Sequence, residues 1–135
     1  MPRFGNKSRR NLAQLDNRLQ LILTEAITHI DFSILCGHRG KAEQNRLVSL
    51  NKSQTPWPES KHNSTPAKAV DIAPYYPTTT HIDWADREGF IYLAGIIRGI
   101  ACLHGTPLRW GGDWDNDNDQ RDENFRDLAH FEIND

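Results

Sequence analysis

Two histidines and one aspartate in this sequence have the residue types and settings of a metal site with one open coordination position. His62 lies in a polar, turn-rich segment, and Asp71 lies inside the short apolar run from Ala69 to Ala73. His130 lies in a comparable run near the end of the chain. A carboxylate between apolar neighbours needs a cationic partner, because an unpaired charge is costly to bury. Two imidazoles and one carboxylate suit Zn²⁺, so we expect these three residues to hold one zinc ion.

A carboxylate near the same histidine is a candidate general base. Asp127 precedes His130 by three residues. Within hydrogen-bond reach of a water polarised by the metal, it could take the proton of that water and return it to a leaving amine. Glu132 follows His130 by two residues on an expected strand, so both side chains point to one side. We expect Glu132 to accept the N–H of a ligand histidine. From spacing alone, a satisfied polar network without a metal explains the same residues.

An arginine lies between two glycines in the turn from Gly37 to Gly40. The guanidinium fork of Arg39 suits a carboxylate, so this side chain could hold a substrate carboxylate or stabilise a developing oxyanion. Gln44, in the helix that follows, is expected near this turn. The alternative is an arginine in a surface turn without a functional role.

Alternating carboxylates between Trp114 and Glu123 resemble the first half of a calcium-binding loop. With Asp115 as the first ligand, the match is incomplete, because Gln120 stands at the sixth position, where the loop needs glycine, and Arg126 at the twelfth, where it needs glutamate. A solvated acidic loop is the alternative. The candidate calcium ligands are Asp113, Asp115, Asp117 and Asp119.

Helices and short strands must position these residues. We expect a helix capped by Asn6 or Ser8 that starts near Arg9 and runs to about His29. A long helix is expected from about Ala85 to His104, with Gly105 as its C-cap. The segment 51–68 is expected to be a loop. Further expected elements are a helix over Lys41–Leu50 and strands over Asp31–Cys36, Ala69–Ala73, Leu108–Trp110 and His130–Ile133.

Length and composition fit one domain over residues 1–135. The chain has 135 residues, of which 37% are hydrophobic, so it can form one core. Its net charge of −2 excludes a general basic surface for nucleic acid. A local basic cluster at the start of the chain reads as a solvated helix end, or as a contact to an anionic cell envelope. Its members are Arg3, Lys7, Arg9 and Arg10.

Neither the cysteines nor the hydrophobic runs point to an exported or membrane-spanning protein. Cys36 and Cys102 lie among apolar residues, so we expect two buried reduced thiols, with a disulfide between them as the alternative. No apolar run has the length of a transmembrane helix, and the basic start has no signal-type hydrophobic segment behind it. We therefore expect synthesis in the cytoplasm without a signal peptide.

The motifs Ser60-x-His62, Asp71 and Asp127-x-x-His130 resemble the VanY/D-alanyl-D-alanine carboxypeptidase family of zinc peptidases. More closely, the chain is similar to small single-domain phage endolysins with L-alanyl-D-glutamate endopeptidase activity. The gap between His62 and Asp71 is longer than usual in that family and lacks glycine, which affects the shape of the loop rather than the ligands. Other motifs match in the same order: Phe4-Gly5-x-x-Ser8, Gly37-x-Arg39, Asp71-x-Ala73-Pro74, Ile82-Asp83-Trp84 and Arg109-x-Gly111-x-Asp113-Trp114.

The resemblance implies an α+β fold of the hedgehog/D-Ala-D-Ala peptidase type, with a small antiparallel sheet packed against helices. It implies zinc bound by His62, Asp71 and His130, with Asp127 as base and with Ser60 and Glu132 around the ligands. The implied substrate is the peptidoglycan stem peptide, cut between L-Ala and D-Glu so that the host wall is lysed. It also implies Ca²⁺ as a candidate regulator at the acidic loop.

Two other functions compete with this one: a D,D- or L,D-carboxypeptidase that trims the stem peptide, and a zinc-containing domain that binds peptidoglycan without hydrolysis. Asp127 argues against the second, because a purely structural site needs no base. No internal repeat or linker is apparent, so we expect a single catalytic domain without a separate wall-binding module, and we expect a monomer. The lytic interpretation implies a holin-type partner that permeabilises the membrane, so that the enzyme reaches the wall in the periplasm.

Overall fold

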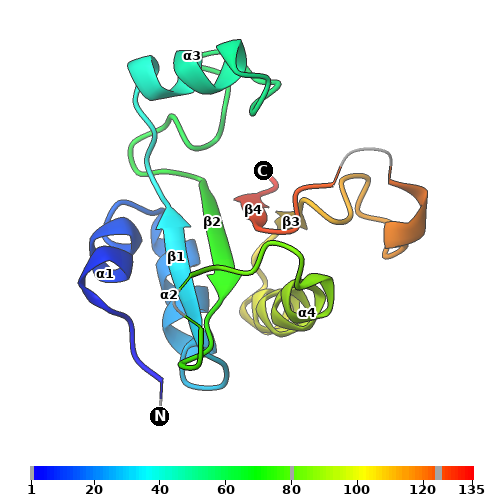
Figure 1. The fold of residues 1–135 in the computed structure, drawn as a ribbon. Coiled ribbons are helices and arrows are strands. Elements are labelled where there is room, and N and C mark those ends of the chain that lie inside the picture. Colours follow the sequence, from blue (N-terminus) through cyan, green and yellow to red (C-terminus); the bar gives the residue numbers. More distant parts are fainter. Residues whose placement is uncertain (1, 80, 124–125) are drawn as a thin grey trace.

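The structure is a computed structural model that describes residues 2–79, 81–123 and 126–135 (Figure 1). Its strands and the two later α-helices lie where the sequence predicts them, within one or two residues at their ends. The segment from 51 to 68 connects α3 to β2 without a helix or strand, also as predicted. The elements are α1 (Asn6–Leu12), α2 (Asn17–Ala26), β1 (Phe32–Cys36), α3 (Lys41–Ser49), β2 (Ala69–Pro74), α4 (Arg87–His104), β3 (Leu108–Trp110), the short 3-10 helix η1 (Gln120–Asp122) and β4 (His130–Ile133).

The four strands form one sheet in the order β1-β2-β4-β3, and every neighbouring pair is antiparallel. The last strand, β4, therefore lies between β2 and β3 rather than at an edge. This insertion pairs Asp71 with His130 and Arg109 with Glu132 across adjacent strands. The predicted α+β class with a small antiparallel sheet is confirmed.

One face of the sheet is apolar, and the ionisable residues of the strands gather on the other face, because side chains alternate along each strand. Helices α2 and α4 join the apolar face in one buried cluster, and Figure 1 shows α2 behind β1. The strand residues in this cluster include Val70, Ile72, Leu108, Trp110, Phe131 and Ile133. The residues between them on the strands are Asp71, Arg109, His130 and Glu132, so the opposite face collects the ionisable groups.

The expected single helix from Arg9 to about His29 is wrong, since the chain forms α1 and α2 with a break between them. The break pairs with the segment before β2: Asp16 N–H donates to the Ala67 carbonyl (2.8 Å), and Ala67 N–H donates to the Gln14 carbonyl (2.9 Å). Asp16 then caps α2 by accepting the backbone N–H of Arg18 (2.9 Å). A tertiary contact thus overrides a continuous helical pattern.

The expected cap of the first helix is also wrong. Helix α1 begins at Asn6, its cap position is Gly5, and no side chain caps it. Ser8 is buried instead, and its Oγ accepts the backbone N–H of Ile34 (3.0 Å) from β1. The predicted end of α4 is confirmed, because Gly105 takes the left-handed conformation with φ of 69°.

Both cysteines are free thiols, but the prediction that both are buried is wrong. Cys102 is exposed, and Cys36 is half-buried. Within the described residues, no helix combines the length and apolar character needed to cross a membrane.

Candidate active site

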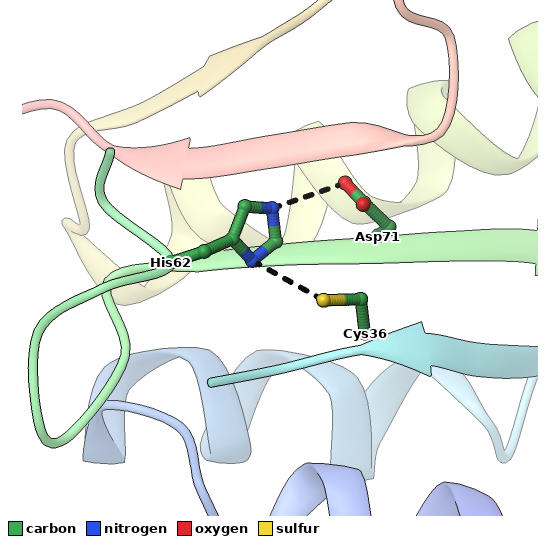
Figure 2. A group of neighbouring side chains, drawn as sticks. All are labelled: Cys36, His62 and Asp71. Carbon is green, nitrogen blue, oxygen red and sulfur yellow. Dashed lines mark hydrogen bonds and ion pairs between the residues drawn. The ribbon is translucent and has the colours of Figure 1, made fainter. Parts of the chain in front are cut away.

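Asp71 lies at the centre of the polar face, between the two predicted histidine ligands. Its Oδ1 lies 3.3 Å from Nε2 of His62 and 3.2 Å from Nδ1 of His130. The strand pairing of β2 with β4 supplies His130, and the loop before β2 supplies His62. The structure therefore brings together the three residues that the sequence selected. Figure 2 shows the ring of His62 between Asp71 and Cys36.

The hydrogen bonds of the two imidazole rings indicate which nitrogen of each carries the proton. Nδ1 of His62 lies 2.8 Å from the Gly37 carbonyl, which can only accept, so Nδ1 is the donor. Nε2 of His130 lies 2.8 Å from Oε1 of Glu132, its shortest polar contact. This leaves a lone pair on Nε2 of His62 and on Nδ1 of His130, and both face the same carboxylate oxygen of Asp71.

This arrangement fits a metal cation. Three groups with lone pairs that converge need a cation or a proton between them, and Nε2 of His62 is buried with no hydrogen-bond partner among the described residues. Two sets of three residues each offer potential ligand atoms that lie within 4.8 Å of one another inside the set, and both sets contain Asp71. One set joins Asp71 to Asp127 and His130, and the other joins it to Cys36 and His62.

Without a cation, protons occupy this place. Burial lowers the pKa of His62, but the interactions with Asp71 and Cys36 together raise that pKa to about 10. Burial likewise opposes and Asp71 favours protonation of His130, whose pKa is raised. Burial raises the pKa of Asp71, but the two histidines hold it well below its usual range. The site thus keeps a carboxylate that demands positive charge.

Asp127 is placed by the turn that leads into β4. Its backbone N–H donates to the Gly111 carbonyl (2.8 Å), and its own carbonyl accepts the N–H of His130 (3.1 Å). Gly111 permits this approach, because a Cβ there would lie 2.0 Å from the Asp127 carbonyl oxygen. Burial raises the pKa of the Asp127 carboxyl, and the negative charge of Asp71 raises it further. A raised pKa suits a group that must both accept and donate a proton.

Glu132 points to the same side of β4 as His130, as predicted, and holds the ring of His130 in place. Its Oε1 meets Nε2 of His130, and its Oε2 lies 2.8 Å from Nη2 of Arg109 and 3.7 Å from Nζ of Lys61. Burial raises the pKa of Glu132, but the bonds to His130 and Arg109 dominate and lower it to about 2. Glu132 is therefore a carboxylate at neutral pH and fixes the ring orientation of His130.

Ser60 acts on the backbone of the His62 loop rather than on its ring. Its Oγ accepts the N–H of His62 (3.2 Å), and its own N–H donates to Oδ1 of Asn63 (3.1 Å). The amide of Asn63 in turn donates to the carbonyl of Arg39 (3.0 Å). This local network gives the long loop a defined shape at the point where His62 enters the site.

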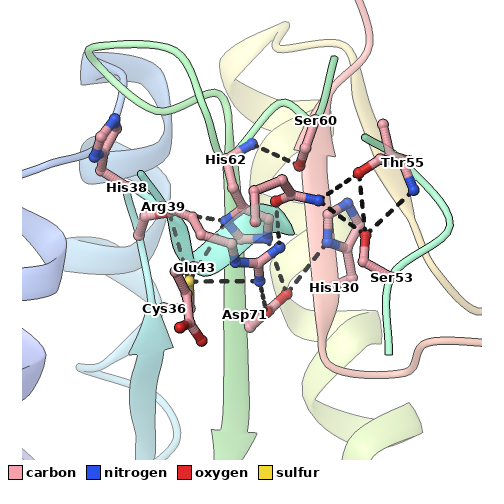
Figure 3. Close-up of polar contacts among 12 residues, drawn as sticks. Cys36, His38, Arg39, Glu43, Ser53, Thr55, Ser60, His62, Asp71 and His130 are labelled. Carbon is pink, nitrogen blue, oxygen red and sulfur yellow. Dashed lines mark hydrogen bonds and ion pairs between the residues drawn. The ribbon is translucent and has the colours of Figure 1, made fainter. Parts of the chain in front are cut away.

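Arg39 belongs to the site and is not an arginine of a free surface turn. Its Nη2 lies 3.5 Å from Oδ2 of Asp71 (Figure 3). Its Nη1 donates to Oε1 of Gln44 (3.0 Å), and Gln44 thus lies near the turn, as predicted. Its backbone N–H donates to the carbonyl of His62 (2.8 Å). The turn, the helix α3 and the His62 loop thus hold one guanidinium against Asp71.

Sequence reasoning missed Cys36 as a neighbour of the site. The pairing of β1 with β2 shifts between Ile34 and Cys36, so that Cys36 stands opposite Asp71. A bulge of this kind turns a side chain that regular alternation would direct to the core. The thiol lies 3.8 Å from Nδ1 of His62 and 3.7 Å from Nη2 of Arg39. The apolar residues before Cys36 gave no signal of this shift.

Arg109 and Trp114 were also missed as parts of the site. Arg109 lies between Leu108 and Trp110 on β3, and this alternation was a usable signal that it faces away from the core. The ring of Trp114 lies 5.4 Å from that of His130, and the guanidinium of Arg109 lies 5.8 Å from the ring of Trp114. All three residues line one cavity of about 940 Å³ that also contains His62, Asp71, Asp127, Arg39 and Glu132.

The acidic loop after Trp110 is anchored by an internal cation. Oδ2 of Asp113 lies 3.3 Å from Nη2 of Arg98 on α4, and Asp113 is only 1% exposed. The carboxylates of Asp113, Asp115 and Asp117 offer ligand atoms within 4.8 Å of one another. Asp119 is directed elsewhere, since its carboxylate pairs with Arg121 (2.9 Å). The loop therefore gathers three of the four residues that the sequence proposed for calcium.

Comparison with known proteins gives one consistent family. The family description "Phage L-alanyl-D-glutamate peptidase" matches residues 1–134. The L-alanyl-D-glutamate peptidase of Escherichia phage T5 is 31% identical over 136 residues, which cover 97% of each chain. The crystal structure of Serratia marcescens L-Ala D-Glu endopeptidase ChiX has the same fold, with a TM-score of 0.76 and 24% identity over 98% of this chain and 90% of that one. The chain therefore belongs to the phage L-alanyl-D-glutamate peptidase family.

Proposed function

We propose that this chain is a zinc-dependent endolysin that hydrolyses the bond between L-Ala and D-Glu in the peptidoglycan stem peptide. Family membership over nearly the whole chain supports the peptidase activity and the bond. The observation that carries the metal dependence is the convergence of two imidazole lone pairs on Oδ1 of Asp71, at 3.3 and 3.2 Å. In the proposal, His62, Asp71 and His130 hold the zinc ion.

A bound zinc ion would supply Lewis-acid polarisation of the substrate carbonyl and of a water in the cavity. Asp127 accepts a proton from the water as its oxygen attacks the carbonyl carbon of L-Ala. The bond from that carbon to the D-Glu nitrogen breaks, and Asp127 delivers the proton to this nitrogen. The products are a carboxyl end on L-Ala and an amino end on D-Glu. In the proposal, Arg39 shifts a donor from its present contacts to the carbonyl oxygen while negative charge develops there.

Two residues around the ligands orient them. Glu132 fixes the tautomer of His130 by accepting its Nε2–H (2.8 Å), and Ser60 fixes the backbone of His62 (3.2 Å). Partners of this kind keep ligand rings in the productive orientation, and their loss commonly lowers metal affinity or activity about 10- to 100-fold.

The biological part of the proposal follows from a lytic activity. In the proposal, residues 1–135 form one catalytic domain that acts as a monomer. The chain is made in the host cytoplasm and reaches the wall in the periplasm after a holin-type protein has permeabilised the membrane.

A regulatory Ca²⁺ site in the acidic loop is the remaining element of the proposal. The close carboxylates of Asp113, Asp115 and Asp117 support it. Because Arg98 already pairs with Asp113, we expect Asp115 and Asp117 to bind the ion most directly. Activity that is unchanged by Ca²⁺ in wild type and in Asp117→Ala would remove this element and leave the peptidase intact.

The decisive experiment uses purified protein on Gram-negative cells whose outer membrane has been permeabilised. We expect loss of turbidity that a zinc chelator prevents and added zinc restores. Mass spectrometry of the released material should find glycan carrying a free L-Ala end and peptides that begin with D-Glu. Release of only terminal D-Ala would instead identify a carboxypeptidase. Absence of any product despite one bound zinc per chain would indicate a binding domain.

A further inference from the structure

Arg109 is a cation in the cavity to which the proposed mechanism gives no task beyond its bond to Glu132. It lies on β3 between two core residues, so alternation directs its side chain to the polar face. The side chain is 34% exposed and lines the same cavity as the zinc ligands. Arginine is the residue best suited to bind a carboxylate through two parallel hydrogen bonds.

The charges around Glu132 leave positive charge uncompensated. Both Arg109 and Lys61 contact Oε2 of Glu132, at 2.8 and 3.7 Å, so two cations share one carboxylate. Lys61 is further engaged, because its Nζ donates to the carbonyl of Ile133. Among the described residues, Arg109 donates to Glu132 alone, and its Nε has no hydrogen-bond partner. A guanidinium has five N–H donors, so Arg109 can donate hydrogen bonds to a second anion without releasing Glu132.

The position of Arg109 places such an anion next to the proposed zinc site. Glu132 bridges Arg109 to His130, with 2.8 Å on each side. The ring of Trp114 packs against both Arg109 (5.8 Å) and His130 (5.4 Å). Binding at Arg109 is therefore binding beside a zinc ligand of the proposed function.

Arg39, the other arginine in the cavity, is less free to take this role. Its donors already meet Oε1 of Gln44 (3.0 Å), Sγ of Cys36 (3.7 Å) and Oδ2 of Asp71 (3.5 Å), and its side chain is only 12% exposed. The charge and the free N–H donors of Arg109 thus favour it over Arg39 as the group that binds a substrate anion.

We propose that Arg109 binds the free carboxylate of the substrate's D-glutamate residue and selects it over the amidated residue. The inference rests on the proposed function and deepens it. A glutamate in a peptide uses one carboxyl group to continue the chain and keeps the other free unless that group has been converted to an amide. The residue on the leaving side of the scissile bond therefore carries either a negative charge or a neutral carboxamide, and Arg109 distinguishes the two.

The test compares two synthetic stem peptides that differ only in this group, one with the free carboxylate and one with the carboxamide. We expect wild type to cleave the carboxylate peptide with a kcat/KM roughly 10- to 100-fold higher, as is typical for one hydrogen bond to a charged group. In Arg109→Met the ratio should fall to about 1. In Arg109→Lys the charge remains without the fork, so an intermediate ratio is expected.

Using the ratio within one variant separates recognition from damage to the site. Loss of Arg109 also loosens Glu132 and His130, but this slows both peptides equally and cancels in the ratio. The matched control is Lys52→Met, which removes another positive charge from the lining of the same cavity. It should keep the wild-type ratio. A ratio near 1 in wild type, or an unchanged ratio in Arg109→Met, would overturn the inference.

A binding measurement keeps the inference independent of turnover. Calorimetry with the product peptides that begin with D-Glu or with its amide should give tighter binding of the carboxylate form by wild type and no preference in Arg109→Met. If wild type cleaves neither peptide, the proposed function fails, while this preference still decides the role of Arg109. Equal affinities of wild type for both products would refute that role.

Discussion

The residue on which the proposed chemistry depends most directly is Asp127. Its carboxylate lies within 4.8 Å of potential ligand atoms of both Asp71 and His130, so geometry allows it to act as base or as a further metal ligand. The raised pKa of its carboxyl, caused first by burial and then by Asp71, favours proton transfer. The two roles predict different zinc contents for a variant of Asp127: unchanged if Asp127 is a base, and lower if it is a ligand.

Asp127→Asn keeps the size of the side chain and removes its basicity. We expect kcat/KM to fall about 1,000-fold, in the range that general acid–base catalysis contributes, with zinc content unchanged. Elemental analysis together with the peptide assay measures both quantities. Loss of bound zinc would make Asp127 a ligand, and normal activity would exclude it as base. His62→Ala serves as the control that should lose zinc.

At the scale of single residues, the sequence carried most of the information about the candidate site. Asp71 between Val70 and Ile72 signals a charge that must be neutralised, and alternation along β4 puts Glu132 beside His130. Cys36 could not be predicted, because its place depends on a bulge in β1 and not on its own neighbours. The partner of Asp113 was equally hidden, since Arg98 lies on a different element and no local pattern joins them.

Elements were predicted where the pattern is local and missed where a tertiary contact decides. The strands β1 to β4 follow from short alternating or apolar runs bounded by glycine, proline and polar residues. The break between α1 and α2 does not, because the apolar stripe continues through it. What ends α1 is pairing of residues 14–16 with Ala67, a contact between segments far apart in sequence.

Gly111 links β3 to the turn that carries Asp127. A Cβ at this position would lie 2.0 Å from the Asp127 carbonyl oxygen, which is backbone and cannot move aside freely. We expect Gly111→Ala to lower the free energy of unfolding by about 3 kcal/mol through overpacking, and to reduce activity as well. Urea denaturation measures the first effect.

Gly95 on α4 provides the matched control, because a Cβ there meets nothing within 4 Å. Gly95→Ala should raise the free energy of unfolding by about 1 kcal/mol through helix propensity alone. Equal effects of the two substitutions would show that the contact between Gly111 and Asp127 is not as tight as described.

The cap of α2 gives a prediction for pH. The carboxylate of Asp16 accepts from Arg18 at its backbone N–H (2.9 Å) and at Nε (3.0 Å), and the side-chain bond is the largest cause that lowers the pKa of Asp16 below 3.8. A carboxyl whose pKa is lower in the folded state stabilises the fold above its unfolded pKa. That contribution disappears as the pH falls through the folded pKa.

Asp16→Asn isolates this charge, because asparagine also caps helices well. We expect the variant to be about 0.5 kcal/mol less stable at pH 7, the size of a partly exposed ion pair. The difference should begin to shrink as the pH falls below about 4, the ordinary pKa of an aspartate, and should vanish only when the pH lies below the still lower pKa of the folded carboxyl. Denaturation curves at several pH values measure it. A difference that stayed constant down to pH 3 would mean that the carboxyl's charge is not the cause.

For the molecule as a whole, the proposed metal site brings together residues from segments that lie far apart in the sequence. His62 comes from the loop after α3, Asp71 from β2 and His130 from the last strand. Oδ1 of Asp71 lies within 3.3 Å of one ring nitrogen of each histidine. The negative charge of Asp71 and the two nitrogen lone pairs repel one another unless positive charge lies between them. A cation there would tie the end of the chain to its middle.

Metal removal should therefore lower the stability of the entire fold and not only the activity. A ligand that binds only the folded state at 1,000 times its dissociation constant adds about 4 kcal/mol, which for a domain of this size corresponds to a shift in Tm of roughly 10 °C. We expect that shift between zinc-loaded and chelator-treated protein, measured by calorimetry.

Two variants serve as controls for this prediction. His62→Ala, which lacks one proposed ligand, should show little response to the chelator. Asp127→Asn should respond as wild type does, because a base contributes to turnover without holding the metal. A Tm that is the same with and without chelator in wild type would contradict zinc binding by these segments.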